Sequence, residues 1–251
     1  MAPIVYFTQV KFVVVDIETT GGRPSGNDIT EIGIVHVQNK KIIHQWSSLI
    51  KPDYSIPNNI QALTGISDEM VQGKVINDAE VAAWFEDDPL IIAHNAAFDR
   101  QMFERRFQQL NHLRWACTFR EIDWRAMGYS NAKLDFLLYS VGYFYQGHRA
   151  WIDSVATAWL LHRHPQALAQ LLKNAESQTC IVQATGSPFA AKEILKARRY
   201  WWDSKARFWH TQVHQQALDE ELAFLDSIPG YDSSQANIIV QDARSRFQAS
   251  Q

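Results

Sequence analysis

The chain has 251 residues, of which 46% are hydrophobic and 20% charged, a composition typical of a folded globular protein with enough apolar side chains for a core. Its formal net charge of −3 argues against a protein that coats nucleic acid through overall positive charge, although it allows an enzyme with a local phosphate-binding site. The two cysteines are too few for a disulfide framework, and no basic leader or membrane-spanning run occurs, so we expect a cytoplasmic protein that does not enter a membrane.

The first predicted strand is VVVDIETTG, residues 13–21. Because side chains alternate along a strand, Asp16 and Glu18 share one face with Phe12 and Val14, and Val13, Val15 and Ile17 share the other. Two interpretations fit this acidic pair. The strand ends at the surface with solvated carboxylates, or the pair is buried and a hard divalent cation neutralises it.

A predicted hairpin follows the loop at residues 21–28. Residues 29–38 and 40–50 alternate in polarity as strands do, and a polar tip at residues 38–41 joins them, so we expect antiparallel neighbours. Glu31 lies within the first of these strands. With no partner motif nearby, we interpret Glu31 as a structural or edge acid and not as a metal ligand.

The middle of the chain alternates between helical and strand patterns. We expect Asn58 or Asn59 to cap one short helix, Ser67 the next, and Asn95 a longer helix over residues 96–110. The other elements predicted here are buried strands at 90–94 and 115–118, and helices at 78–86, 119–126, 133–141 and 149–163. This order predicts an α/β fold with a mixed sheet.

Near residue 165 the composition changes, and we expect the first domain, residues 8–166, to end there. Residues 187–230 are predicted to form a small α-rich module with a short aromatic strand or turn. Residues 231–251 are predicted to be a mobile tail.

Three segments carry residues suited to one chemistry. Besides the acidic pair, HNAAFD places Asp99 in the first turn of a helix, and GHRAWID places His148 in a loop with Asp153 one turn into the next helix. Four carboxylates brought together repel one another unless cations screen them. Two divalent ions about 3.5–4 Å apart are the known arrangement for cutting phosphodiesters.

These segments resemble the three motifs of the DEDDh 3′–5′ exonucleases, which include proofreading subunits and ribonuclease T-like trimming enzymes. The order and spacing of the motifs fit, and TTG after Glu18 and LTGIS at residues 63–67 add to the similarity. The resemblance covers residues 10–165. Trp151 departs from it, since a smaller aliphatic residue is commoner there, and we expect this change to affect packing only.

The resemblance implies a ribonuclease H-like fold, with a mixed five-stranded sheet and helices on both faces. It also implies that Asp16, Glu18, Asp99 and Asp153 hold two Mg²⁺ or Mn²⁺ ions. His148 would then accept the proton of the attacking water, a role suited to the ordinary pKa of histidine, about 6.5.

The resemblance further implies a set of substrate-binding residues. Thr19 and Thr20 would contact the terminal nucleotide, and Leu63 would pack against the last base. Phe98 belongs to the same expected set. His94 is open between packing at the end of its strand and a phosphate contact.

The implied activity is release of nucleoside 5′-monophosphates from the 3′ end of single-stranded DNA. A 3′–5′ exoribonuclease is the first alternative, because the residues that would read the ribose 2′-hydroxyl cannot be placed. A non-catalytic nucleic-acid-binding adaptor is the second. No polymerase region or clamp-binding segment is visible, which favours a freestanding enzyme, and a homodimer is an open possibility.

Residues 192–207 hold six Lys or Arg against two acids, interleaved with Tyr200, Trp201 and Trp202. Basic residues among exposed aromatic ones suit single-stranded nucleic acid. Alternatively, these aromatic side chains build the core of a small module.

Overall fold

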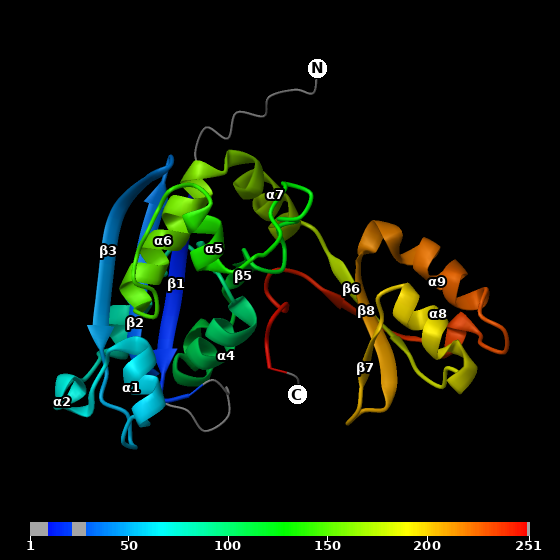
Figure 1. Ribbon diagram of the computed structural model, residues 1–251, viewed down its shortest axis with the longest axis horizontal. Helices are drawn as coiled ribbons and strands as arrows, with labels where there is room; N and C mark the ends of the chain where they lie inside the picture. The colour runs from blue at the N-terminus through cyan, green and yellow to red at the C-terminus, as the bar shows by residue number, and fades with distance from the viewer. Residues whose placement is uncertain (1–9, 22–28, 250–251) are drawn as a thin grey trace. The chain divides into compact units, whose positions relative to one another are not determined.

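The computed structural model describes residues 10–21 and 29–249, and the chain divides into two compact units (Figure 1). Unit 1 comprises the residues up to 174 together with those from 246 onwards, and unit 2 comprises residues 175–245. Unit 2 is therefore inserted between the main part of unit 1 and a C-terminal segment that returns to unit 1.

Unit 1 contains a five-stranded sheet of order β3-β2-β1-β4-β5. Its strands are β1 (Lys11–Thr19), β2 (Ile29–Gln38), β3 (Lys41–Leu49), β4 (Leu90–Ala93) and β5 (Arg114–Cys117). The hairpin β2–β3 is antiparallel and β2 pairs antiparallel with β1, whereas β1, β4 and β5 run parallel. The predicted mixed five-stranded sheet is confirmed.

Helices cover both faces of this sheet. The helices of unit 1 are α1 (Asn58–Thr64), α2 (Asp68–Val71), α3 (Asp78–Ala83), α4 (Ala96–Arg106), α5 (Leu134–Tyr139) and α6 (Ala150–Arg163), and α7 (Pro165–Glu176) leads into unit 2. Val13, Val15 and Ile17 pack with apolar side chains of α3 and α4, while α6 lies against β1 and β2 on the opposite face. The alternation predicted along β1 therefore separates an apolar face from the acidic one.

Several local predictions are corrected. Helix α1 begins at Asn58 after Pro57, so neither asparagine caps it, although Ser67 does cap α2 by accepting a hydrogen bond from the Met70 amide at 3.3 Å. Asn95 precedes α4 but makes no capping hydrogen bond. The helix predicted at residues 119–126 is a series of turns.

Unit 2 is built on a sheet, whereas we expected an α-rich module. Its strands are β6 (Thr179–Ala184), β7 (Trp201–Asp203), β8 (Phe208–His214) and β9 (Asn237–Gln241), in the antiparallel order β7-β8-β6-β9. Helices α8 (Lys192–Ala197) and α9 (Leu218–Asp226) pack on one face of the sheet. The strands are short, and β8 carries Gln and His on its other face, so their apolar alternation is weak in the sequence.

The segment predicted to be a mobile tail is ordered in its described part, residues 231–249. Strand β9 pairs with β6, and Arg246, only 1% exposed, lies inside unit 1. The Arg246 guanidinium binds the Glu121 carboxylate and donates to the Asn174 carbonyl at 2.8 Å, while Arg100 donates to the Arg246 carbonyl at 2.7 Å. These contacts anchor the C-terminal segment, because a buried guanidinium is stable only when its donors are paired.

Candidate active site

The acidic pair of β1 lies where that strand faces α6. In the register of the β1–β2 ladder, Asp16 is opposite Gly33 and Glu18 is opposite Glu31. Gly33 is required for the close approach of α6, because a Cβ atom there would lie 2.3 Å from the Ala150 carbonyl oxygen. The absence of a side chain at residue 33 thus lets the first turn of α6 rest on the sheet beside Asp16.

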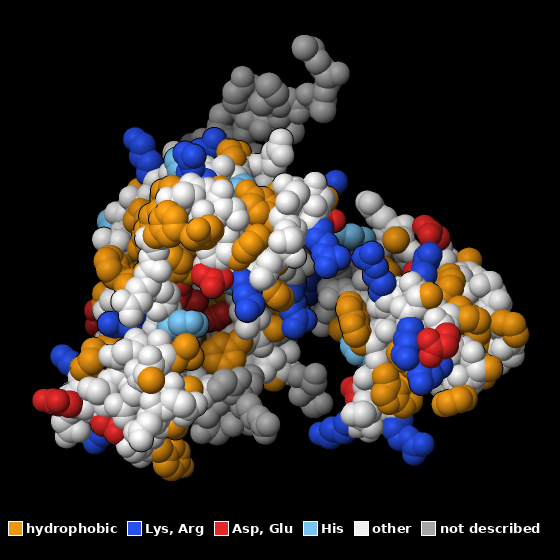
Figure 2. Space-filling model, viewed as in Figure 1, with side chains coloured by type: hydrophobic (Ala, Val, Ile, Leu, Met, Phe, Trp, Pro, Cys, Tyr) orange, Lys and Arg blue, Asp and Glu red, His pale blue; other side chains and the backbone are white. Residues whose placement is uncertain are grey.

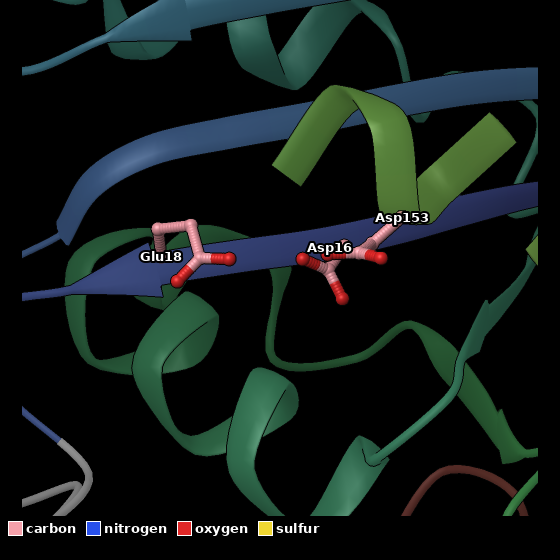
Figure 3. A group of neighbouring side chains, drawn as sticks. All are labelled: Asp16, Glu18 and Asp153. Atoms are coloured by element: carbon pink, nitrogen blue, oxygen red, sulfur yellow. The ribbon is translucent and has the colours of Figure 1, made fainter. Parts of the chain in front are cut away.

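Asp153 joins the pair from this first turn of α6. Asp16, Glu18 and Asp153 each offer a carboxylate oxygen, and these oxygens lie within 4.8 Å of one another (Figure 3). Figure 2 shows acidic side chains deep in a hollow on this face of unit 1, with a histidine beside them. Residues 137 positions apart in the chain are therefore gathered at one point, since Asp16 and Asp153 meet there.

Asp99 lies beside this group but not in it. Its side chain is 3% exposed, and its Oδ1 accepts a hydrogen bond from the Ile17 amide at 3.1 Å, which places it at the strand between Asp16 and Glu18. Its charge contributes to the raised pKa of Asp16, so the two carboxylates are close enough to interact. Three of the four predicted acids therefore lie close enough together to bind the same metal ion, and the fourth, Asp99, lies beside them.

The environment opposes the negative charge of these acids. Desolvation is the largest cause in each case: it raises the pKa of Glu18 and of Asp99 to about 8, and it raises the pKa of Asp16 and of Asp153. Repulsion from neighbouring carboxylates adds to the effect for Asp16, Glu18 and Asp99. In the described part of the chain, no Lys or Arg forms an ion pair with the three clustered acids.

These residues fit a hard divalent cation. Carboxylate oxygens are the ligands that Mg²⁺ and Mn²⁺ prefer, and an ion would neutralise charges that have no Lys or Arg ion-pair partner among the described residues. The acidic cluster therefore supports the predicted metal site, while the number and identity of the ions are not decided by it.

His148 lies in the loop before α6, held by Asp153. Its backbone amide donates to Asp153 Oδ2 at 2.7 Å, and the Arg149 amide donates to the same oxygen at 3.3 Å. His148 has a backbone φ of 65°, in the left-handed region that non-glycine residues rarely adopt. Together with Asp16 and Asp153, it lines a cavity of about 580 Å³.

Arg149 and Tyr145 also support this loop, although neither was predicted to have a role. Arg149 binds Glu31 through two hydrogen bonds, from Nε at 2.9 Å and from Nη2 at 3.0 Å, and Glu31 also accepts from the Ala150 amide at 3.0 Å. The Tyr145 hydroxyl donates to Asp153, and burial together with that carboxylate raises the pKa of Tyr145. The sequence feature that could have indicated a role for Arg149 is its position inside the third motif, directly after His148. Glu31 has the structural role that we predicted for it.

The predicted substrate-binding residues lie in different surroundings. Thr19 and Thr20 are buried, and the Thr19 hydroxyl is hydrogen-bonded to the backbone of Gly21. Leu63 is 51% exposed at the end of α1, whereas Phe98 is half-buried against the core of unit 1. Contact of these four residues with a nucleotide stays a prediction.

His94 lines the cavity of about 580 Å³. Its Nδ1 lies 2.8 Å from the Thr118 hydroxyl, and burial lowers the pKa of His94 to about 4. The imidazole is therefore neutral near pH 7, so a phosphate contact at His94 would be a hydrogen bond and not an ion pair.

Comparison with known proteins agrees with this geometry. Residues 13–161 match the sequence profile of the exonuclease family RNase_T. The chain is similar to DNA polymerase III PolC-type of Thermotoga maritima, with 31% identity over 66% of the chain, and to the 3′–5′ exonuclease DinG of Staphylococcus epidermidis, with 38% identity over 40% of the chain. It spans only 12% and 11% of the lengths of these relatives.

Two solved structures share the fold. Exonuclease I of E. coli, in a zinc-bound complex with single-stranded DNA, aligns over 71% of this chain and 48% of its own, with a TM-score of 0.55 and 18% identity. The nuclease domain of 3′hExo, a DEDDh family member bound to rAMP, aligns over 64% of this chain and 94% of its own, with a TM-score of 0.52 and 20% identity. Within the described residues, no helix combines the length and apolar character needed to cross a membrane.

Proposed function

The chain belongs to the RNase_T exonuclease family, and from this premise we propose that it is a metal-dependent 3′–5′ exonuclease that releases nucleoside 5′-monophosphates from single-stranded DNA. The observation that carries the proposal is the cluster of Asp16, Glu18 and Asp153, whose oxygens lie within 4.8 Å and which lack a cationic partner among the described side chains. A carboxylate cluster of this kind suits divalent ions and the phosphodiester chemistry that such ions promote.

Asp16, Glu18 and Asp153 would hold the metal, with Asp99 bordering the same site. Two Mg²⁺ or Mn²⁺ ions fit our proposal. When bound, they supply an activated water and charge neutralisation at the leaving 3′ oxygen. The chain contributes the fixed positions of the carboxylates, because β1 and the first turn of α6 are both held by the sheet.

His148 would take the proton from the attacking water. It lines the same cavity as Asp16 and Asp153, so its imidazole is in the part of the site where a water would react. Arg149, fixed by Glu31, and the two amides that bind Asp153 hold the loop in its left-handed turn. We assign Arg149 and Glu31 as positioning residues.

DNA is the substrate that we propose, because the PolC-type relative is a DNA polymerase at 31% identity. An exoribonuclease is the second candidate, supported by the rAMP bound to the 3′hExo nuclease domain. A non-catalytic adaptor is not favoured, since all four acids and His148 are present. We further propose that the enzyme acts without a polymerase subunit; a homodimer is compatible with this function.

Digestion of matched 5′-labelled DNA and RNA oligonucleotides tests the proposal. With Mg²⁺ or Mn²⁺, we expect a ladder that shortens from the 3′ end and nucleoside 5′-monophosphates as products. EDTA should stop the reaction, and Asp153→Ala should abolish it. Intact DNA and RNA in both metals would contradict the exonuclease assignment, and faster loss of RNA would select the second candidate.

A further inference from the structure

Unit 2 lies outside residues 13–161, which match the exonuclease family, and the proposed chemistry does not use it. Its charges are segregated along the chain. Residues 192–207 contain six Lys or Arg and two acids, whereas residues 218–232 contain five acids and no Lys or Arg. The cationic part comprises α8, β7 and the turn before β8, and the acidic part comprises α9 and the residues after it.

The sheet of unit 2 has one face packed on helices and one face without them. Val182 and Trp209 point to the packed face, where they join the core formed with α8 and α9. Alternation then places Trp201, Phe208 and His210 on the opposite side, which we call the outer face. The helices α8 and α9 both contribute to the packed face.

Aromatic rings gather on the outer face near the β7–β8 turn. Trp201 is paired with His210 across the two strands, with ring centroids 6.5 Å apart, and Phe208 lies 6.2 Å from His210. Trp201 is 64% exposed, so a large ring is presented to solvent although a packed core lies on the other side of the sheet. The interpretation in which these aromatics only build a core accounts for Tyr200, which is 3% exposed in that core, but not for Trp201.

The turn between β7 and β8 adds positive charge next to these rings. Asp203 is the acid of this turn, and its carboxylate accepts hydrogen bonds from the Lys205 and Ala206 amides at 2.9 and 2.8 Å. Lys205 and Arg207 are exposed, and neither forms an ion pair with a described residue. Figure 2 shows basic side chains at the lower end of unit 2, where Figure 1 places this turn.

We propose that the outer face of unit 2 is a second binding site, for single-stranded nucleic acid. Unpaired bases stack on Trp201 and Phe208, and the phosphates between them contact Lys205 and Arg207. Single strands fit this surface better than duplexes, because in a duplex the faces of the bases are already stacked on one another.

The consequence for activity rests on the proposed exonuclease function. A strand held by unit 2 stays tethered to the enzyme after each cut, which raises the effective concentration of its 3′ end. Loss of the second site should therefore raise the KM for long strands and leave cleavage of very short ones unchanged.

Binding without cleavage is the direct test. The 251-residue chain is titrated in EDTA into a 5′-labelled oligothymidine of about 20 nucleotides, longer than the roughly 4–16 nucleotides that one small binding fold covers, and fluorescence anisotropy is recorded. Trp201→Ala should weaken binding about 5- to 150-fold, the range for loss of one base-stacking ring. Phe189→Ala removes another exposed aromatic of unit 2, outside the sheet, and should leave binding unchanged.

The salt dependence separates charge from stacking. The double variant Lys205→Ala/Arg207→Ala should lower the slope of log K against log salt by about 1.4, or 0.7 for each lost phosphate contact. Lys40→Ala/Lys41→Ala, at the exposed turn between β2 and β3 of unit 1, removes the same formal charge and should keep the slope.

The proposed site would be ruled out if Trp201→Ala bound as tightly as wild type, or if Phe189→Ala lost as much affinity as Trp201→Ala. Self-association of the wild type that Trp201→Ala abolishes would assign the face to a second copy of the chain instead. A trinucleotide assay distinguishes the two proposals: if wild type cuts no substrate, the exonuclease assignment fails, and the anisotropy result still decides the second site.

Discussion

The two units of this protein treat desolvated acids in opposite ways. In unit 2, Glu221 is 4% exposed, and its carboxylate binds Arg198 at 3.0 Å and the Tyr200 hydroxyl at 2.9 Å. In unit 1, the clustered acids Asp16 and Glu18 have no such partner among the described residues, and desolvation raises the pKa of both.

This difference shows which buried carboxylates are structural. A buried carboxylate that is paired with a cation and a hydroxyl group is stable without a ligand. A cluster of carboxylates without ion-pair partners is stable only when it is protonated or when a cation binds. Unit 1 itself contains the control for this argument, since Glu31 lies opposite Glu18 and is paired with Arg149. Glu31 is 2% exposed and thus more buried than the half-buried Asp16 and Glu18, so burial does not mark the site; the missing ion-pair partner does.

The largest effect is expected for Glu18→Gln. Loss of one ligand should lower kcat by about 10³-fold, because metal-assisted charge stabilisation contributes several kcal/mol to the transition state. In EDTA at pH 9, however, the same variant should unfold at a higher temperature than wild type, because it removes a buried charge. Activity and thermal unfolding are measured on the same sample, and a Glu18→Gln protein that is both active and less stable would contradict our assignment.

His148→Ala should lower kcat by about 10²- to 10⁴-fold, the usual contribution of a general base. The clustered acids are unchanged, so Mg²⁺ should raise the unfolding temperature of His148→Ala as much as that of wild type. Isothermal titration with Mn²⁺ checks this separation. Loss of metal binding in His148→Ala would make His148 a structural residue of the site and not the base.

Glu221→Gln in unit 2 is the matched opposite of Glu18→Gln. It leaves Arg198 and Tyr200 with a weaker acceptor, so we expect a loss of about 1–3 kcal/mol in the free energy of unfolding. Cleavage of a trinucleotide should be unchanged, since Glu221 lies in the other unit. Denaturant unfolding tests the expected loss of stability, and a kinetic assay tests the unchanged cleavage. An activity loss equal to that of Glu18→Gln would contradict the difference between the two acids.

Arg149→Lys tests the positioning role with a smaller change. Lysine keeps the charge but not the paired hydrogen bonds to Glu31, so kcat should fall about 10-fold, in the range found for groups that orient metal ligands. The KM should change little. Arg163→Lys, at the end of α6, is the control and should behave as wild type.

A pH dependence of stability is also expected without metal. The folded-state pKa of Glu18 and of Asp99, about 8, lies above their ordinary values of 4.5 and 3.8, so the folded protein binds more protons than the unfolded one between those limits. Their contribution to stability is complete below about pH 4 and is lost as the pH rises through about 8. The unfolding temperature in EDTA should therefore fall from pH 6 to pH 9, and Mg²⁺ should restore it most at pH 9. An increase over that range would contradict the raised pKa values.

Local patterns in the amino-acid sequence were sufficient for much of unit 1. Alternation along residues 13–19 placed Asp16 and Glu18 on one face of β1, and the spacing of HNAAFD and GHRAWID placed Asp99 and Asp153 in the first turns of α4 and α6. These features repeat every 2 or 3.6 residues, so neighbouring side chains alone reveal them.

Contacts between distant segments needed the tertiary structure. The pairing of Glu31 with Arg149 joins residues 118 positions apart, and the return of Arg246 to Glu121 joins residues 125 apart. The sheet of unit 2 also requires β9 to pair with β6, although α8 and α9 lie between these two strands in the sequence. No periodic pattern specifies which polar side chain will find which partner, because that choice is made by the packing of elements that the chain brings together only when it folds.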